Sequence, residues 1–150
     1  MAAEFIFPFP PINVALSNLN IVGSGSGSTA PDQSNIIKAS ESFDLSVQVD
    51  FKPAGNVFLD LLLSVPLTIE TSFQIEGFGT STEANLSGVP VPTTGFPAAV
   101  YIYTPKFTGT AAGAGLVPGV YNAAVVVTIK WGVTPIAFGF VSDVVFQVYG

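Results

Sequence analysis

Strict alternation of apolar and polar residues from Ser42 to Phe51 is the feature that most constrains the fold. The apolar positions are Phe43, Leu45, Val47, Val49 and Phe51, and the positions between them are Asp44, Ser46, Gln48 and Asp50. Because successive side chains of a strand point to opposite faces, this pattern predicts a strand with one buried and one solvated face. The chain is therefore expected to build a sheet that is dry on one side and wet on the other.

Further strand-like stretches follow along the chain, separated by turns rich in Gly and Pro. We predict strands at residues 12–22, 57–65, 67–79, 100–107, 122–131 and 136–149, with phase changes that indicate bulges near 17–18 and 141–142. The stretch 57–65 is apolar on both faces. A helix is conceivable there, but its short length between two prolines favours a strand. About seven or eight strands without a substantial helix are typical of an all-β sandwich or barrel.

Three segments differ in composition from the predicted strands. Residues 1–11 alternate aromatic residues with proline, and because proline cannot donate to a sheet, they are expected to form an edge strand or an extended arm. The Gly-Ser repeat in 23–34 predicts a flexible surface loop, and 80–97 is expected to be a long loop. A chain of 150 residues usually holds one core, so we expect a single domain at residues 12–150.

The segment Leu116-Val-Pro-Gly-Val-Tyr121 precedes a run of alternating apolar residues from Ala123 to Val127. It resembles the tyrosine corner of immunoglobulin-like and fibronectin-III-like sandwiches. The resemblance implies that the Tyr121 hydroxyl group bonds to the backbone near Leu116–Pro118, and it marks Pro118 and Gly119 as structural residues of the turn. It also implies an antiparallel two-sheet β-sandwich of immunoglobulin-like type.

The same resemblance orders the predicted strands as B (42–51), C (57–65), C′ (67–79), E (100–107), F (122–131) and G (136–149). The chain departs from antibody domains, since it has no cysteine and Trp131 ends strand F instead of lying in strand C. It is therefore more similar to a generic bacterial or viral module of this type. Such a fold by itself implies no activity.

Several classes of function are excluded by residue types that the chain lacks. It has no Cys, His or Arg, so it has no thiol nucleophile, no imidazole base and no guanidinium group for phosphate recognition. Its four lysines are isolated, which argues against nucleic-acid binding. Glu70 and Glu76, like Asp44 and Asp50, would lie about 20 Å apart on one strand, too far for glycoside hydrolysis, and pairs across neighbouring strands are the alternative. We therefore expect no enzyme and no catalytic, metal or cofactor site.

The cellular location is not determined by the sequence. It contains no apolar run of the roughly 20 residues that a membrane-spanning helix needs. Its first residues lack the basic start and the uninterrupted apolar stretch of a secretory signal. We favour an extracellular, cell-surface or virion location, with the cytoplasm as the alternative.

Apolar residues on the solvent side of the predicted strands indicate self-association. If Tyr121 faces inward, Val126 faces outward, and Phe58, Leu62 and Val145 are expected beside it. Isolated monomers rarely expose such a patch. We therefore predict a non-catalytic structural or assembly subunit that forms a homo-oligomer, with coverage of this face by the chain's own loops as the alternative.

The N-terminal arm supplies a second candidate contact. An extended segment carrying Phe5, Phe7 and Phe9 can add a strand to a neighbouring subunit, and packing on its own domain is the alternative. A different function is an adhesion-type module that binds a carbohydrate or an apolar ligand. Its candidate contacts are Tyr101, Tyr103 and Trp131.

Overall fold

The alternating segment forms strand β3 (Ser42–Lys52) in the computed structural model, which describes residues 12–23, 35–65, 67–96 and 99–150. All five apolar side chains of the alternation are buried, with exposed fractions of 2% or less. In the first sheet β3 pairs with β1 (Asn13–Gly23) on one edge, and with β7 (Ile102–Tyr103) and β8 (Lys106–Thr110) on the other. The predicted dry and wet faces of this sheet are confirmed.

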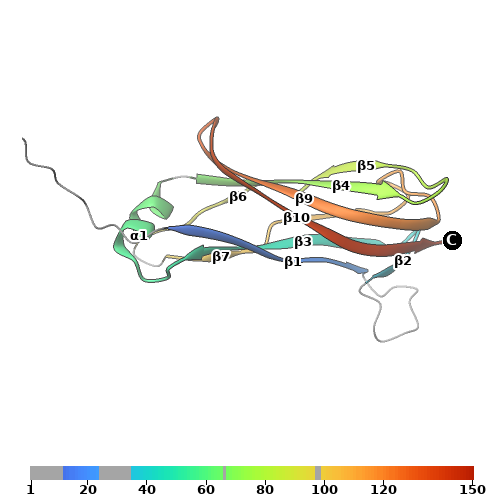
Figure 1. Ribbon diagram of the computed structural model, residues 1–150, viewed down its shortest axis with the longest axis horizontal. Coiled ribbons are helices and arrows are strands. Elements are labelled where there is room, and N and C mark those ends of the chain that lie inside the picture. Colours follow the sequence, from blue (N-terminus) through green and yellow to red (C-terminus); the bar gives the residue numbers. More distant parts are fainter. Residues whose placement is uncertain (1–11, 24–34, 66, 97–98) are drawn as a thin grey trace, which may run out of the picture.

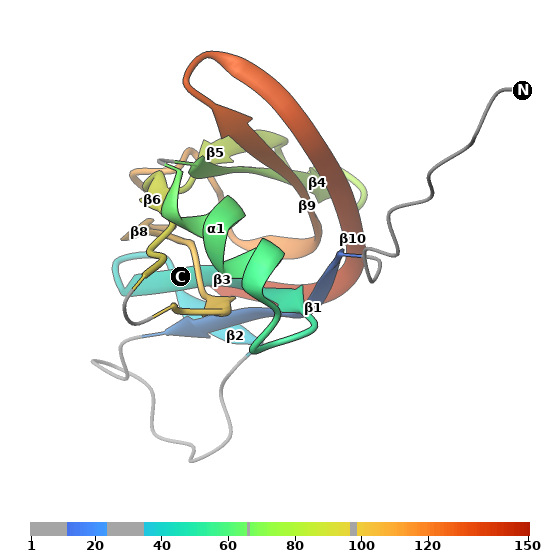
Figure 2. The same ribbon diagram turned by 90° about the vertical axis from the view of Figure 1, so that its left-hand side faces the viewer.

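The second sheet has the order β2-β10-β9-β4-β5, with β6 also paired to β4. Its strands are β2 (Ile36–Lys38), β4 (Leu67–Gly77), β5 (Ala84–Ser87), β6 (Val91–Pro92), β9 (Gly119–Trp131) and β10 (Thr134–Tyr149). All pairings are antiparallel except that of β2 with the end of β10. Figures 1 and 2 show the two sheets as facing layers, so the expected two-sheet all-β architecture is confirmed.

The core lies between the two sheets. Alternate residues of β4 and β9 are buried and face the buried side chains of β3. Phe73, Val125 and Val47 are fully buried members of this cluster. The core is therefore shared by strands far apart in the sequence, and each sheet buries its inner face against the other.

Both predicted bulges are present. The register of β1 against β3 shifts between Ser17 and Asn20, and Asn18 has a φ of 51°. The register of β10 against β9 shifts between Val141 and Val144, and Asp143 has a φ of 76°. Asn and Asp tolerate this left-handed backbone better than most residues, so each bulge has a suitable residue at its strained position.

The prediction of a strand at 57–65 is wrong, because this segment forms helix α1 (Val57–Ser64) at one end of the sandwich (Figures 1 and 2). The side chain of Asn56 caps the helix by accepting hydrogen bonds from the backbone N–H groups of Phe58 and Leu59. Leu59 and Leu63, one helical turn apart, are buried, whereas Leu61 is half exposed. The helix is too short to cross a membrane, and among the described ranges no helix meets that length.

Other boundaries differ from the sequence-based expectations. The predicted strand at 100–107 is divided into β7 and β8 around Pro105, and the predicted loop at 80–97 contains β5 and β6. The place beside β9 that was assigned to 57–65 is taken by β4. The structure thus has ten strands and one helix among the described residues, more than the predicted seven or eight strands. The arm at 1–11 and most of the loop at 23–34 lie outside the described residues.

The Tyr121 side chain connects the start of β9 to the preceding turn. Its hydroxyl group donates a hydrogen bond to the carbonyl oxygen of Val117, within the segment that the tyrosine-corner motif indicates. The ring is fully buried and stacks on Phe146, with 5.4 Å between ring centroids. Pro118 lies on the exposed side of this turn and Gly119 opens the strand.

We expect Tyr121→Phe to lower the free energy of unfolding by about 1 kcal/mol or more. The substitution keeps the buried ring and removes the hydrogen bond to Val117 together with a longer contact of 3.5 Å to the Thr82 hydroxyl group. The net contribution of one hydrogen bond is usually of this size. Urea denaturation followed by circular dichroism measures the change. A variant with an unchanged midpoint and an unchanged slope would show that the hydroxyl contact does not stabilise the turn.

Candidate functional site

The hairpin of β9 and β10 carries a dense group of exposed apolar side chains. Its two-residue turn joins Trp131 to Thr134, with Gly132 at a φ of 61°, and Figures 1 and 2 show the turn standing clear of the two sheets. The exposed fractions are 61% for Trp131, 92% for Val133, 46% for Ile136, 81% for Phe138 and 61% for Phe140. We call these five residues the hairpin patch.

Two residues of the patch lie on the outer face of the second sheet. Phe138 pairs with Thr128, and Phe140 pairs with Val126. Opposed residues in antiparallel strands point to the same face, and the buried residues of β9 alternate with these outward positions. Val145 is half exposed and pairs with Asn122 on this same face.

The predicted interface residues are therefore only partly brought together. Val126 and Val145 share the outer face of β9 and β10, as expected. Phe58 and Leu62 do not extend this face, because they lie on α1 and not on a strand beside β9. Phe58 is 46% exposed and Leu62 is partly buried against the core. Phe5, Phe7 and Phe9 lie outside the described residues.

Charge is nearly absent from the hairpin. Between Val126 and Val141 the sequence contains one charged residue, Lys130. Its ammonium group forms an ion pair with Glu70 on β4, with 2.7 Å between Nζ and Oε2. None of the five patch residues is charged, so burying the patch removes no ionic group from water.

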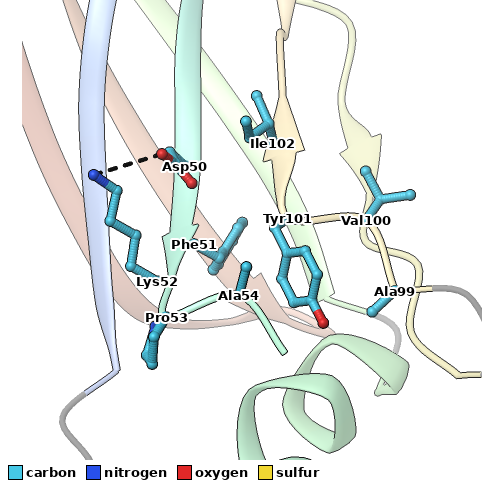
Figure 3. Close-up of a pocket in the computed structure, with 9 residues that line it drawn as sticks. All are labelled: Asp50, Phe51, Lys52, Pro53, Ala54, Ala99, Val100, Tyr101 and Ile102. Carbon is cyan, nitrogen blue, oxygen red and sulfur yellow. Dashed lines mark ion pairs between the residues drawn. The ribbon is translucent and has the colours of Figure 1, made fainter. Parts of the chain in front are cut away.

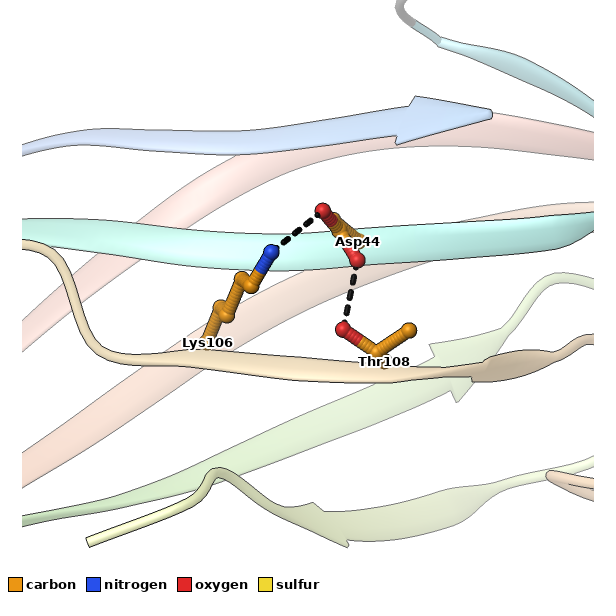
Figure 4. A network of polar contacts seen from close by, with 3 residues as sticks. All are labelled: Asp44, Lys106 and Thr108. Atoms are coloured by element: carbon orange, nitrogen blue, oxygen red, sulfur yellow. Dashed lines mark hydrogen bonds and ion pairs between the residues drawn. The ribbon is translucent and has the colours of Figure 1, made fainter. Parts of the chain in front are cut away.

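The strand carboxylates act as partners of surface lysines. Asp44 accepts hydrogen bonds from Thr108 at 2.6 Å and from Lys106 at 2.9 Å (Figure 4). Both contacts, that of Thr108 foremost, lower the pKa of Asp44 below its usual value. Asp50 pairs with Lys52 at 3.6 Å. Within the described ranges no three acidic side chains are grouped closely enough to hold a metal ion.

An apolar pocket of about 740 Å³ lies at the end of the first sheet, near α1 (Figure 3). Its lining comes from two separate segments, Asp50–Ala54 and Ala99–Ile102. The Tyr101 hydroxyl donates a hydrogen bond to a carboxylate oxygen of Asp60 on α1, at 2.5 Å. This bond raises the pKa of Tyr101, because ionisation of the phenol would lose it. Nothing in the sequence indicated that these two segments would meet.

The aromatic residues considered for ligand binding do not form one surface. Tyr103 is buried, packs edge-on against Phe51 and bonds through its hydroxyl oxygen to the backbone N–H of Thr94. Tyr101 lines the pocket in the first sheet, whereas Trp131 lies on the hairpin of the second sheet. A sugar-binding platform made from all three side chains is therefore not present.

Comparisons with known proteins leave the function open. No family model and no curated protein matches the sequence. Among solved structures, AggA, the major subunit of type I aggregative adherence fimbriae of Escherichia coli, aligns with a TM-score of 0.47 and 7% identity, covering 97% of this chain and 100% of that one. A β-glucosidase of Listeria innocua in complex with gluconolactone aligns with a TM-score of 0.42 and 11% identity, covering 93% of this chain.

The alignment spans only 16% of the β-glucosidase. With TM-scores below 0.5, neither similarity carries an inference about what this chain does. The functional conclusion therefore depends on the surface of the chain itself.

Proposed function

We propose that this chain is a non-catalytic structural subunit that self-associates, with the hairpin patch as its main contact. The observation that carries the proposal is the exposure of Trp131, Val133, Phe138 and Phe140 in one hairpin, whose stretch from Val126 to Val141 has Lys130 as its one charged residue. A soluble monomer seldom keeps so many large apolar side chains together in water. The occupant we assign to the patch is a second copy of the same chain.

The geometry of the hairpin supports pairing between copies. The β2 strand pairs with Gln147–Tyr149 of β10, and near Gly139 this side of β10 lies close to Leu16 of β1 without a strand pairing between them. Backbone donors and acceptors without a strand partner can pair with another strand. Apolar side chains on the outer face of β10 would then gain burial from the same contact.

Charge sets the conditions under which association is expected. The chain carries a formal net charge of −6, so two copies repel at low ionic strength. Salt at about 0.1 M shortens the range of this repulsion to about 10 Å. Association through an uncharged patch is therefore expected to strengthen as salt is added or as the pH is lowered towards the isoelectric point.

Sedimentation velocity of the full chain over a range of concentrations and salt tests the proposal. We expect a concentration-dependent oligomer, and we expect Phe138→Lys to weaken self-association by at least about tenfold, because burying one Phe side chain contributes about 1.5–3 kcal/mol. The added positive charge reduces the net negative charge, so electrostatic repulsion cannot explain a loss.

Phe78→Lys is the matched control. Phe78 is 56% exposed in the turn after β4, outside the patch, and its substitution changes the net charge equally. The Phe78→Lys variant should associate like the wild type. A wild-type chain that stays monomeric at high concentration in both low and high salt would refute self-association. Equal weakening by both variants would refute the hairpin patch as its site.

A further inference from the structure

The apolar pocket lies next to the point where the N-terminal arm joins the domain. Asn13, the first residue of β1, is the register partner of Lys52, and Lys52 lines the pocket. Phe51, Pro53, Val100 and Ile102 give the pocket its apolar lining (Figure 3). The chain that precedes Asn13 therefore joins the domain beside this opening.

The arm has the composition and the length to fill such a pocket. Residues 5–11 contain three phenylalanines and no charged side chain, which suits a lining that is mostly apolar. Prolines 8, 10 and 11 disfavour a helical backbone in the residues before them, so the sequence favours an extended segment. At about 3.3 Å per residue, Phe9 can lie about 13 Å from Asn13, and Phe5 about 26 Å.

The charged groups at the rim do not oppose an apolar occupant. Asp50 and Lys52 form an ion pair with each other, with 3.6 Å between their charged atoms. The Tyr101 hydroxyl group is bonded to Asp60 on α1. These three rim side chains thus already have partners, and an apolar segment would not leave them without one.

We propose that this pocket receives the Phe5–Phe9 segment of a second copy. The inference rests on the proposed self-association and assigns it a second contact. An extended arm that continues the line of β1 leads away from its own domain, since β1 runs from the pocket end towards the opposite end of the sandwich (Figure 1). A neighbour related by a two-fold axis can take up that arm and return its own.

The start of β1 also indicates which symmetry suits the proposed exchange. The start of β1, from which the arm extends, and the pocket are at the same end of the molecule, so a two-fold neighbour can both donate an arm and accept one. Such an exchange uses one self-complementary surface and closes on itself as a dimer. An arm at the end opposite the pocket would instead join copies head to tail into an open chain.

Disulfide trapping tests this inference in the full chain, which contains no cysteine of its own. Phe7→Cys is combined in one chain with Val100→Cys, and Ala54→Cys is a second acceptor in the pocket lining. After mild oxidation, non-reducing electrophoresis is expected to show a covalent dimer of twice the 15.5 kDa chain mass. The matched control combines Phe7→Cys with Val117→Cys, because Val117 and Val100 are exposed to 46% and 43%.

The outcomes separate the possible arrangements. A covalent dimer formed severalfold faster with the pocket cysteines than with the control supports the exchange. If the free thiols disappear without a covalent dimer, the disulfide has formed within one chain and the arm binds its own pocket. A ladder of larger products shows that copies join into an open chain. Either result overturns the proposal. If the pocket cysteines cross-link no faster than the control and the wild type still associates in sedimentation, the pocket is not the binding site of the arm, and the proposed self-association stands. A monomeric wild type would instead remove the self-association on which the inference rests.

Discussion

Leu59→Ala is expected to lower the free energy of unfolding by about 2–5 kcal/mol, whereas Leu61→Ala is expected to cost less than about 1 kcal/mol. Leu59 is fully buried, and Leu61, two residues later, is 50% exposed. On a strand, residues two apart lie on the same face and would be equally buried. On the helix α1 they lie on different faces, so truncation removes core contacts at one position only.

Urea denaturation of both variants, followed by circular dichroism, measures this difference. The pair is matched, since the same side chain is shortened in the same way within one helical turn. Leu63→Ala extends the series, because Leu63 is also fully buried one turn after Leu59. Similar losses at Leu59 and Leu61 would contradict the helix and support a strand at this end of the sandwich.

Phe73→Ala is expected to produce the largest loss, about 3–5 kcal/mol, as is usual for truncating a buried aromatic side chain. Phe73 is fully buried at the middle of β4, where it pairs with Leu86 on one side and Val125 on the other. The two sheets cannot close over the missing ring without moving several strands. The cavity that remains therefore adds to the lost burial.

Gln74→Ala is the control for this prediction. Gln74 is the next residue of the same strand, and its side chain is exposed on the outer face. Its truncation should change the free energy of unfolding by no more than about 0.5 kcal/mol. Comparable effects at the two positions would mean that the inner and outer faces of β4 are wrongly assigned.

The main strands were predictable because their alternating pattern allows only one assignment of buried and exposed faces. In β3 and β4, a shift by one residue would bury Asp44 or Glu70 and expose Phe43 or Ile69, so the pattern fixes which face is inward. The two bulges were also predictable, since a bulge reverses the phase of the alternation. β2 was not, because a strand as short as Ile36–Lys38 has too few residues to show a period.

The helix could not be predicted from hydrophobicity because 57–65 is apolar at nearly every position. Such a run is equally compatible with a strand and with a helix, and its short length between two prolines does not distinguish the two. The stronger signal was Asn56, a favourable N-cap directly before the run. The prolines had a different effect at 100–107, where Pro105 interrupts the ladder and divides one predicted strand into two.

The candidate contact surfaces were predictable only where they follow a single strand. Val126 and Val145 were placed outward from their phase relative to buried neighbours, and the structure places both there. Phe138 and Phe140 follow the same rule, as they alternate with the half-buried Ala137 and Gly139. The apolar pocket combines two segments about fifty residues apart, and no local pattern can indicate which segments meet.

The connectivity of the second sheet sets the order in which its strands can join during folding. The hairpin of β9 and β10 is closed by a two-residue turn, so its pairing needs almost no loop closure. The pairing of β4 with β9 joins Leu67 to Trp131 and Gly77 to Tyr121, residues distant in the chain. Closing such loops costs conformational entropy before the distant contacts form, and chains dominated by distant pairings fold slowly. We therefore expect the hairpin of β9 and β10 to close before β4 docks onto it.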